Sequence, residues 1–231
     1  MNWTRQCVAV IPCFNEAPTI GAVIAEVRGY MPNIIVVDDG SSDGTALKAE
    51  AAGAEVIRLG RNGGKGVALR AGWHRAQERG FIWALTMDGD GQHAPEDIPK
   101  FFAQAETSPA TLVVGNRMGN AEAMPWVRRQ VNRWMTRRLS RLTGVRLADS
   151  QCGFRLVNME TMARLPLAAN RFEIESETIV AFLRAGERVE FVPIQVIYES
   201  SRSNICPLRD TWRWLRWWSA TCSPMNFKKA V

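Results

Sequence analysis

The chain has 231 residues, of which 46% are hydrophobic and 23% charged, so it can fill one large core and is not a disordered polypeptide. Its net charge of +6 comes from the second half, because basic and acidic side chains number 11 and 13 in residues 1–120 but 18 and 10 in residues 121–231. Arginine supplies 24 of the 29 basic residues, and its planar fork matches phosphate oxygens. The second half is therefore expected to have an anionic partner. Zinc-finger, RNP-like and basic-zipper patterns do not occur in the sequence, so nucleic acid is not expected to be that partner.

The cysteine pattern and the hydropathy pattern both bear on where the protein works. The cysteines are scattered without close pairing, which predicts reduced, mostly buried thiols at Cys7, Cys13, Cys152, Cys206 and Cys222. The first residues do not form a charged and then apolar leader. No stretch reaches the run of about 18 apolar residues that a spanning helix needs. We therefore expect a cytoplasmic protein whose membrane contact is peripheral.

Short β-branched runs alternate with helical patterns through the first half of the chain. Strands are expected at residues 7–12, 33–39, 54–59, 81–88 and 111–117, and helices at residues 18–29, 43–52, 65–79 and 95–105. This alternation predicts βαβ units and a mostly parallel sheet. After about residue 120, arginine-rich helical stretches surround shorter and less regular strands. No internal repeat or flexible linker separates the two parts, so the second half is not expected to fold alone.

Polar residues follow the ends of four of the expected strands. These clusters are Asn15 with Glu16, Asp38 with Asp39, Asp88 with Asp90, and Asn116 with Arg117. In open α/β sheets, ligands bind at the carboxyl ends of the strands. Asp88 and Asp90 repel each other unless a cation lies between them, and a hard divalent ion typically bridges such carboxylates to the phosphates of a substrate. The pattern therefore predicts phosphate chemistry at this edge of the sheet.

A glycine-rich segment at residues 61–69, RNGGKGVAL, resembles a phosphate-binding loop only in part. A Walker A loop requires Ser or Thr after its lysine, and Gly66 follows Lys65 here. A Rossmann GxGxxG segment does not follow the first expected strand either. The glycines are interpreted as a tight strand-to-helix turn, with Lys65 free to reach a phosphate. A purely structural turn is the alternative.

Eight segments occur in the order found in family-2 glycosyltransferases with the GT-A fold. They are VAVIPCFNE, VVDDGSSDGT, RNGGKGVALRAG, MDGDGQH, GNR, DSQCGFRL, FEIESE and the RS of YESSRSN. Over roughly residues 6–204, the chain resembles the dolichol-phosphate and polyprenyl-phosphate mannose or glucose synthases. The resemblance implies an α/β fold of the GT-A type, which has a Rossmann-like, mostly parallel sheet flanked by helices. It also implies one domain at 1–204, divided into a nucleotide-sugar-binding half at 1–120 and an arginine-rich helical acceptor half at 121–204.

The same resemblance implies a nucleotide-sugar donor and a metal cofactor. The residues implied for donor binding are Pro12, Asn15, Glu16, Asp39, Lys65 and Asp88, with Asp39 hydrogen-bonding the base. Asp88 would lie near the ribose and the metal, while Asp90 and Gln92 would bind the Mg²⁺ or Mn²⁺ that joins the diphosphate. Such a metal acts as a Lewis acid on the leaving nucleoside diphosphate. A capping or turn role for the aspartates is the alternative.

Arginines are the candidates for holding a lipid-phosphate acceptor. Such a phosphate arrives as an oxyanion, so it needs cations to hold it and no base to activate it. The candidates are Arg117, Arg128 or Arg129, and Arg202, with Ser203 beside the last. Asn204 stands where the lipid-phosphate synthases often have a lysine, which removes one possible phosphate contact.

Several other polar residues have more than one possible role. Asp149 either serves as the base for a hydroxyl acceptor, orients the donor sugar, or is a turn residue before the GFRL segment. Glu173 and Glu175 would point the same way if extended, and would then hold sugar hydroxyls or order an arginine. His93 lies where a turn begins and is expected at the surface or in support of a neighbouring residue, with a third metal ligand or a base as the alternative.

Two segments suggest contact with an anionic membrane surface. In residues 126–142, apolar residues recur at helical spacing while the arginines lie largely off that stripe, which predicts a basic amphipathic helix. Residues 205–231 form an amphipathic tryptophan and arginine segment that contains Trp212, Trp214, Trp217 and Trp218. Tryptophan and arginine favour the lipid headgroup region. Core packing of the first helix and docking of the second onto the domain are the alternatives.

These observations support one leading hypothesis and two alternatives. The leading hypothesis is a metal-dependent, inverting transfer of a hexose from a nucleotide sugar of the GDP-mannose or UDP-glucose type to a polyprenyl phosphate, by an enzyme peripheral on the cytoplasmic face of the membrane. The first alternative is a family-2 glycosyltransferase that acts on a hydroxyl of a lipid or glycan, with Asp149 as base. The second is a non-catalytic, nucleotide-sugar-binding membrane adaptor.

Overall fold

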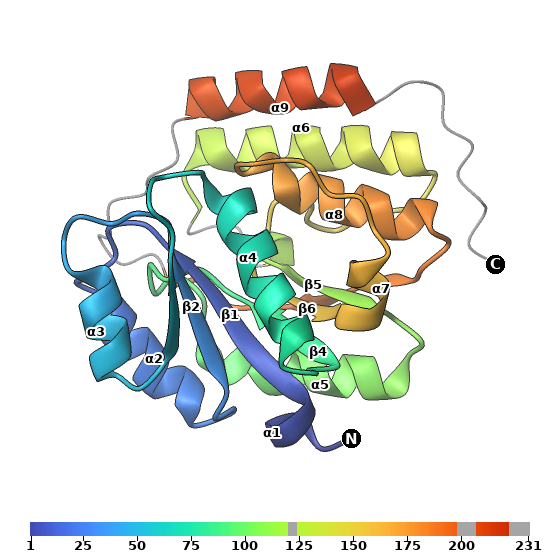
Figure 1. Ribbon diagram of the computed structural model, residues 1–231. Coiled ribbons are helices and arrows are strands. Elements are labelled where there is room, and N and C mark those ends of the chain that lie inside the picture. Colours follow the sequence, from blue (N-terminus) through green and yellow to red (C-terminus); the bar gives the residue numbers. More distant parts are fainter. Residues whose placement is uncertain (120–123, 198–206, 222–231) are drawn as a thin grey trace.

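The computed structural model describes residues 1–119, 124–197 and 207–221, and within them seven strands form one sheet flanked by helices (Figure 1). The strands are β1 (Cys7–Cys13), β2 (Ile34–Asp38), β3 (Glu55–Arg58), β4 (Trp83–Thr86), β5 (Leu112–Asn116), β6 (Arg155–Asn158) and β7 (Val189–Pro193). Their order across the sheet is β3-β2-β1-β4-β6-β5-β7. Only β6 runs antiparallel to its neighbours, so the expected mostly parallel sheet is confirmed.

The helices alternate with the strands as the sequence predicts for the first half. They are α1 (Trp3–Gln6), α2 (Ile20–Arg28), α3 (Thr45–Ala51), α4 (Lys65–Glu78), η1 (Pro95–Asp97), α5 (Ile98–Thr107), α6 (Trp126–Thr143), α7 (Met159–Ala163), α8 (Glu173–Arg184) and α9 (Pro207–Thr221). Within the described ranges, no helix is both long and apolar enough to cross a membrane.

The core explains why the apolar runs became strands. The β1 run CVAVIPC is almost wholly buried, which is typical of a strand whose two faces are both covered. Helix α4 packs so closely on this strand that a Cβ atom added to Gly72 would clash with the side chain of Val10. Glycine at this position therefore fixes how near α4 comes to the sheet, and so where its first residue, Lys65, lies.

The topology gathers the four polar clusters along one edge of the sheet. Strands β1, β2 and β4 are parallel neighbours. Strands β4 and β5 are both antiparallel to β6, which lies between them, so they run in the same direction as each other. The carboxyl ends of β1, β2, β4 and β5 consequently meet at the same edge, where ligands of open α/β sheets bind.

The second half of the chain completes the sheet and adds a pair of helices beside it. Strands β6 and β7 share the sheet with the strands of the first half. Helices α6 and α9 run side by side (Figure 1), and the rings of Trp134 and Trp214 touch where they meet. The extended conformation considered for Glu173 and Glu175 is wrong, because both residues lie in the first turn of α8.

Candidate active site

A pocket of about 290 Å³ lies at the edge where these strands end. It brings together residues that the sequence analysis selected from different segments: Pro12, Glu16, Asp39, Lys65, Asp88, Asp90 and Arg128. Other lining residues were not expected there: Phe14, Asn62, Arg171, Phe172 and Arg213. We call this cavity the polar pocket.

Asn15 and Asp39 organise the loops around the polar pocket. Asn15 is exposed and lies beside the pocket lining, with a left-handed φ of 57°. Its side-chain oxygen accepts a hydrogen bond of 3.0 Å from the backbone N–H of Ser42. Asp39 lines the pocket, and its two oxygens accept hydrogen bonds from the N–H groups of Gly63 and Gly64 at 2.8 and 2.7 Å. Asp39 thus fixes the glycine-rich loop that leads into Lys65.

Lys65 is partly buried between two carboxylates. Its Nζ atom lies 2.5 Å from Oδ1 of Asp88 and 2.6 Å from Oε1 of Glu175. Burial alone would lower the pKa of Lys65, but these two charges raise it above its ordinary value. Space here is tight, since a Cβ atom on Gly153 would lie 2.7 Å from Nζ. The sequence suggested that Lys65 is free to reach a phosphate, but its ammonium group is already paired. A donor phosphate would have to compete for it with two carboxylates.

Three carboxylates in the polar pocket interact unfavourably with one another. Burial, followed by the charges of Asp90 and Asp88, raises the pKa of Glu16 to about 7. Burial and then Asp88 also raise the pKa of Asp90. Asp88 differs, because burial disfavours its charge but Lys65, together with His93 and Arg117, holds the pKa of Asp88 well below its usual range. The pocket therefore keeps negative charge beside Asp90 that a further cation would compensate.

These oxygen atoms fit Mg²⁺ or Mn²⁺ as a partial ligand set. Among the described residues, no group of three or more His, Cys, Asp or Glu side chains forms a complete metal site. Mg²⁺ is often bound by only one or two carboxylates, with water and substrate phosphates as the other ligands. Gln92 is buried, and its backbone N–H donates to Oδ1 of Asp90 at 3.0 Å, which orients that carboxylate.

His93 supports Asp88 and is not a surface residue. Its ring is 4% exposed and stacks on Phe154 with the centroids 5.0 Å apart. Its Nδ1 atom accepts a hydrogen bond of 3.1 Å from the N–H of Asp88. Nε2 also lies 3.9 Å from Oδ2 of Asp88, but burial lowers the pKa of His93 to about 4, so the ring is neutral at pH 7 and this contact is not an ion pair. The surface alternative is therefore wrong for His93.

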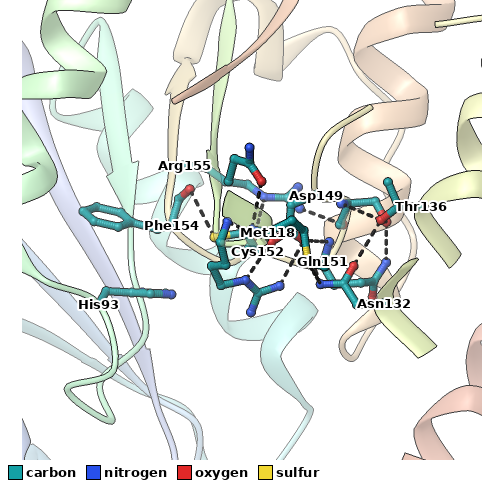
Figure 2. A network of polar contacts seen from close by, with 12 residues as sticks. His93, Met118, Asn132, Thr136, Asp149, Gln151, Cys152, Phe154 and Arg155 are labelled. Atoms are coloured by element: carbon teal, nitrogen blue, oxygen red, sulfur yellow. Dashed lines mark hydrogen bonds and ion pairs between the residues drawn. The ribbon is translucent and has the colours of Figure 1, made fainter. Parts of the chain in front are cut away.

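Asp149 is fully buried at the centre of a polar network (Figure 2). Arg117 donates from Nε to Oδ2 at 2.8 Å and from Nη2 to Oδ1 at 3.0 Å. Asn132 and the backbone N–H of Gln151 each donate to Oδ1 at 3.0 Å. Burial disfavours the carboxylate, but Arg117 holds the pKa of Asp149 below its ordinary value. A carboxylate with this pKa and these donors is a poor proton acceptor.

The network continues from Asp149 to α9. The side chain of Gln151 donates to the hydroxyl of Ser176 at 2.8 Å, and the indole N–H of Trp214 donates to the same oxygen at 2.9 Å. Trp214 is 2% exposed. Its expected contact with a membrane is therefore wrong, and Trp214 instead docks α9 onto the rest of the chain. The sequence predicted neither the hydrogen bonds to Ser176 nor the contact between Lys65 and Glu175.

A second pocket of about 290 Å³ adjoins the first, and we call it the apolar groove. Helices α6, α8 and α9 line it, with Val127, Val131, Met135 and Trp214 as apolar contributors. Arg128 and Phe172 line both cavities, so the two meet there. Of the other acceptor candidates, Arg117 lines the apolar groove and Arg129 is partly buried. Arg202, Ser203 and Asn204 lie outside the described residues.

Comparison with known proteins identifies relatives of this chain. Polyprenol monophosphomannose synthase of Mycolicibacterium smegmatis is 32% identical over 72% of this chain and 66% of its own length. A UDP-N-acetylglucosamine--dolichyl-phosphate N-acetylglucosaminyltransferase of Methanococcus voltae is 31% identical over 82% of this chain and 84% of its own. The fold matches that of glucosyl-3-phosphoglycerate synthase from Mycobacterium tuberculosis, solved with Mn²⁺, UDP and phosphoglyceric acid, with a TM-score of 0.74 at 23% identity over 96% of this chain and 80% of that one.

The family itself follows from a match over most of the chain. The sequence profile of Glycosyl transferase family 2 matches residues 8–165, which contain these strand ends and all four carboxylates that line the polar pocket, Glu16, Asp39, Asp88 and Asp90. The seven-stranded, mostly parallel sheet of the described residues agrees with the GT-A fold that the sequence resemblance implied. The chain belongs to glycosyl transferase family 2 and is a glycosyltransferase with the GT-A fold.

Proposed function

We propose that this glycosyltransferase moves a hexose from a nucleotide sugar to a polyprenyl phosphate, with inversion at the anomeric carbon. One observation carries the proposal: a polar pocket rich in carboxylates meets an apolar groove, and Arg128 lies where they join. A sugar donor with a metal-bound diphosphate suits the first cavity, and an amphiphile with a phosphate head suits the second. Relatives named for polyprenol and dolichyl phosphate support this choice of acceptor.

The donor would occupy the polar pocket, with Mg²⁺ or Mn²⁺ bound by Asp90 together with Asp88 and Gln92. When bound, such an ion supplies Lewis-acid stabilisation of the leaving diphosphate. We propose that residues 1–120 bind the nucleotide sugar. Pro12, Glu16 and Asp39 would contact the nucleotide. Lys65 already pairs with Asp88, and moving its ammonium group toward the diphosphate would add a second positive charge there.

The acceptor would bring its own nucleophile. One phosphate oxygen forms the new bond to the anomeric carbon while the bond from that carbon to the donor diphosphate breaks, and the bonding pair leaves with the diphosphate oxygen. Arg128, at the junction, is placed to hold the attacking phosphate. We also propose that Arg117, which precedes the acceptor half at residues 121–204, and Arg129, Arg202 and Ser203 within that half hold the acceptor. No proton has to be removed from the acceptor, because the second pKa of its phosphate is about 6.

Asp149 distinguishes this reaction from transfer to a hydroxyl. A hydroxyl acceptor needs a base beside it, whereas Asp149 is fully buried, paired with Arg117 and low in pKa. The geometry instead supports Asp149 as a residue that positions Arg117 at the apolar groove. We propose that the reaction takes place at the cytoplasmic face of the membrane; the protein would be peripheral to the bilayer in which the chain of a polyprenyl phosphate is anchored.

A donor and acceptor panel tests the function. GDP-mannose, UDP-glucose and UDP-N-acetylglucosamine would each be mixed with a short polyprenyl phosphate or with the matching unphosphorylated polyprenol, and release of nucleoside diphosphate followed. Release is expected with one donor class, only with the phosphate, and only when Mg²⁺ or Mn²⁺ is present. Asp90→Asn should abolish it, while Glu96→Gln, at an exposed carboxylate near the same loop, should not. Release with the polyprenol alone, or undiminished release in EDTA, would overturn the proposal.

A further inference from the structure

Large apolar side chains are exposed on two adjacent helices. On α6 they are Trp126, Val127 and Trp134, and on α9 they are Trp212 and Leu215. Trp126 is 65% exposed and Trp212 is 56% exposed. The inner faces of the same helices are covered, since Leu139 of α6 and Trp214 of α9 are buried. Apolar groups gathered on one exposed surface mark an interaction site more often than single exposed residues do.

Arginines surround these apolar side chains. Arg133, Arg137, Arg138 and Arg141 are exposed on α6, and Arg216 is exposed on α9. The sequence of α6 contains no acidic residue. The guanidinium of Arg216 lies 4.9 Å from the ring centre of Trp212, so a cation and an aromatic ring are presented together. This combination complements a partner that is anionic at its surface and apolar beneath.

Helices α6 and α9 adjoin each other. The rings of Trp134 and Trp214 lie 5.5 Å apart, centre to centre. The guanidinium of Arg138 lies over both Trp134 of α6 and Trp218 of α9, at 5.1 and 5.9 Å from the ring centres. Val127 is exposed and also lines the apolar groove, so the groove opens beside this surface.

We propose that the outer faces of α6 and α9 together form the surface that binds an anionic lipid bilayer. Tryptophan and arginine are residues that favour the headgroup region, and an amphipathic helix can lie in the plane of that region. Two such helices, contacting through their aromatic side chains, would place the mouth of the apolar groove against the lipid. The inference rests on the proposed function only in that the acceptor would reach the groove from the bilayer. Binding to the bilayer itself needs neither donor nor acceptor.

Flotation with vesicles tests this surface on the 231-residue chain. The probes are phosphatidylcholine vesicles with or without phosphatidylglycerol. Trp126→Ser with Trp212→Ser should remove most binding to either kind. Arg133→Gln with Arg137→Gln should weaken binding about fivefold per arginine, only for vesicles with phosphatidylglycerol, and less at high salt. None of these four residues lines either pocket, so each variant should transfer sugar to a short polyprenyl phosphate in solution as the wild type does.

Matched controls separate this surface from general effects on the fold. Tyr30→Ser with Leu47→Ser removes two exposed apolar side chains from other elements, and Arg5→Gln with Arg164→Gln removes two exposed charges. Both controls should float like the wild type. The inference is overturned if the test variants also float like the wild type, if the controls lose as much, or if the wild type forms dimers through this face and does not bind vesicles. Sugar transfer without vesicle binding would leave the proposed function standing and reject only this surface.

Discussion

Arg117 and Asp149 form a two-pronged ion pair in the interior, with Nε to Oδ2 at 2.8 Å and Nη2 to Oδ1 at 3.0 Å. Removing one partner would leave the other charge buried without it. Asp149→Ala is therefore expected to lower the free energy of unfolding by roughly 3–5 kcal/mol, and Asp149→Asn by less, because the amide oxygen still accepts hydrogen bonds. Urea unfolding followed by circular dichroism measures both.

An exposed ion pair provides the control for this prediction. Arg58 and Glu50 lie 2.8 Å apart and are both about half exposed. Exposed pairs contribute about 0–1 kcal/mol, so Glu50→Ala should change the free energy of unfolding little. If Asp149→Ala and Glu50→Ala destabilised the protein equally, the buried pair would not have the structural importance that its geometry indicates.

The same pair predicts a dependence of stability on acid. The pKa of Asp149 is below its ordinary value in the folded chain, so this residue binds fewer protons folded than unfolded. Its stabilising contribution is fully present above the unfolded pKa of about 3.9 and is lost as the pH falls through the folded value. The difference in free energy of unfolding between wild type and Asp149→Asn should therefore be constant near neutrality and shrink below about pH 4. A difference that grew on acidification would have the wrong sign.

The sequence alone identified the sheet and most of the polar pocket because those features are local. A buried apolar run followed directly by carboxylates identifies both a strand and the position of its end, as with β4 and Asp88. The parallel topology then places such ends together. By contrast, Lys65 and Glu175 are 110 positions apart, and no local pattern predicts that their side chains meet. The pairing depends on where α4 and α8 come to lie.

Trp214 shows a second reason why the sequence did not predict every feature of the structure. Four tryptophans between residues 212 and 218 lie on several sides of a helix, so composition does not indicate which of them faces inward. The structure separates them: Trp212 is exposed, whereas Trp214 is buried against Ser176. Only the packing of α9 on α6 and α8 decides this. His93 is similar, because a histidine beside a turn gives no sign of the ring stacking on Phe154.

Lys65 is expected to contribute to binding of the donor. Lys65→Met removes the positive charge that pairs with both Asp88 and Glu175. The loss of one charged contact to the donor diphosphate should cost ~2 kcal/mol of transition-state stabilisation. This corresponds to a roughly thirtyfold lower kcat/KM for the nucleotide sugar. Lys65→Arg should restore only part of it, because the space beside Gly153 is limited.

Kinetics with varied donor and varied acceptor measure this effect separately for the two substrates. Lys100→Met is the control, since Lys100 pairs with Asp97 and does not line the polar pocket. If Lys65→Met changed only the KM for polyprenyl phosphate, Lys65 would belong to the acceptor and its assignment to the donor would have to be abandoned.

Trp214 should be required for the docking of α9. Its ring is buried against Trp134 and Trp218, and its N–H donates to Ser176. Trp214→Ala removes both, and truncation of a buried aromatic residue typically costs about 3–5 kcal/mol. Trp214→Phe keeps much of the ring and loses the hydrogen bond, at a cost of about 1 kcal/mol. Limited proteolysis should then cleave within residues 207–221 rapidly in Trp214→Ala and slowly in Trp214→Phe. Trp212→Ala, at an exposed position of the same helix, is the control and should resist cleavage like the wild type. Equal protection of Trp214→Ala and wild type would show that α9 is held by its other contacts.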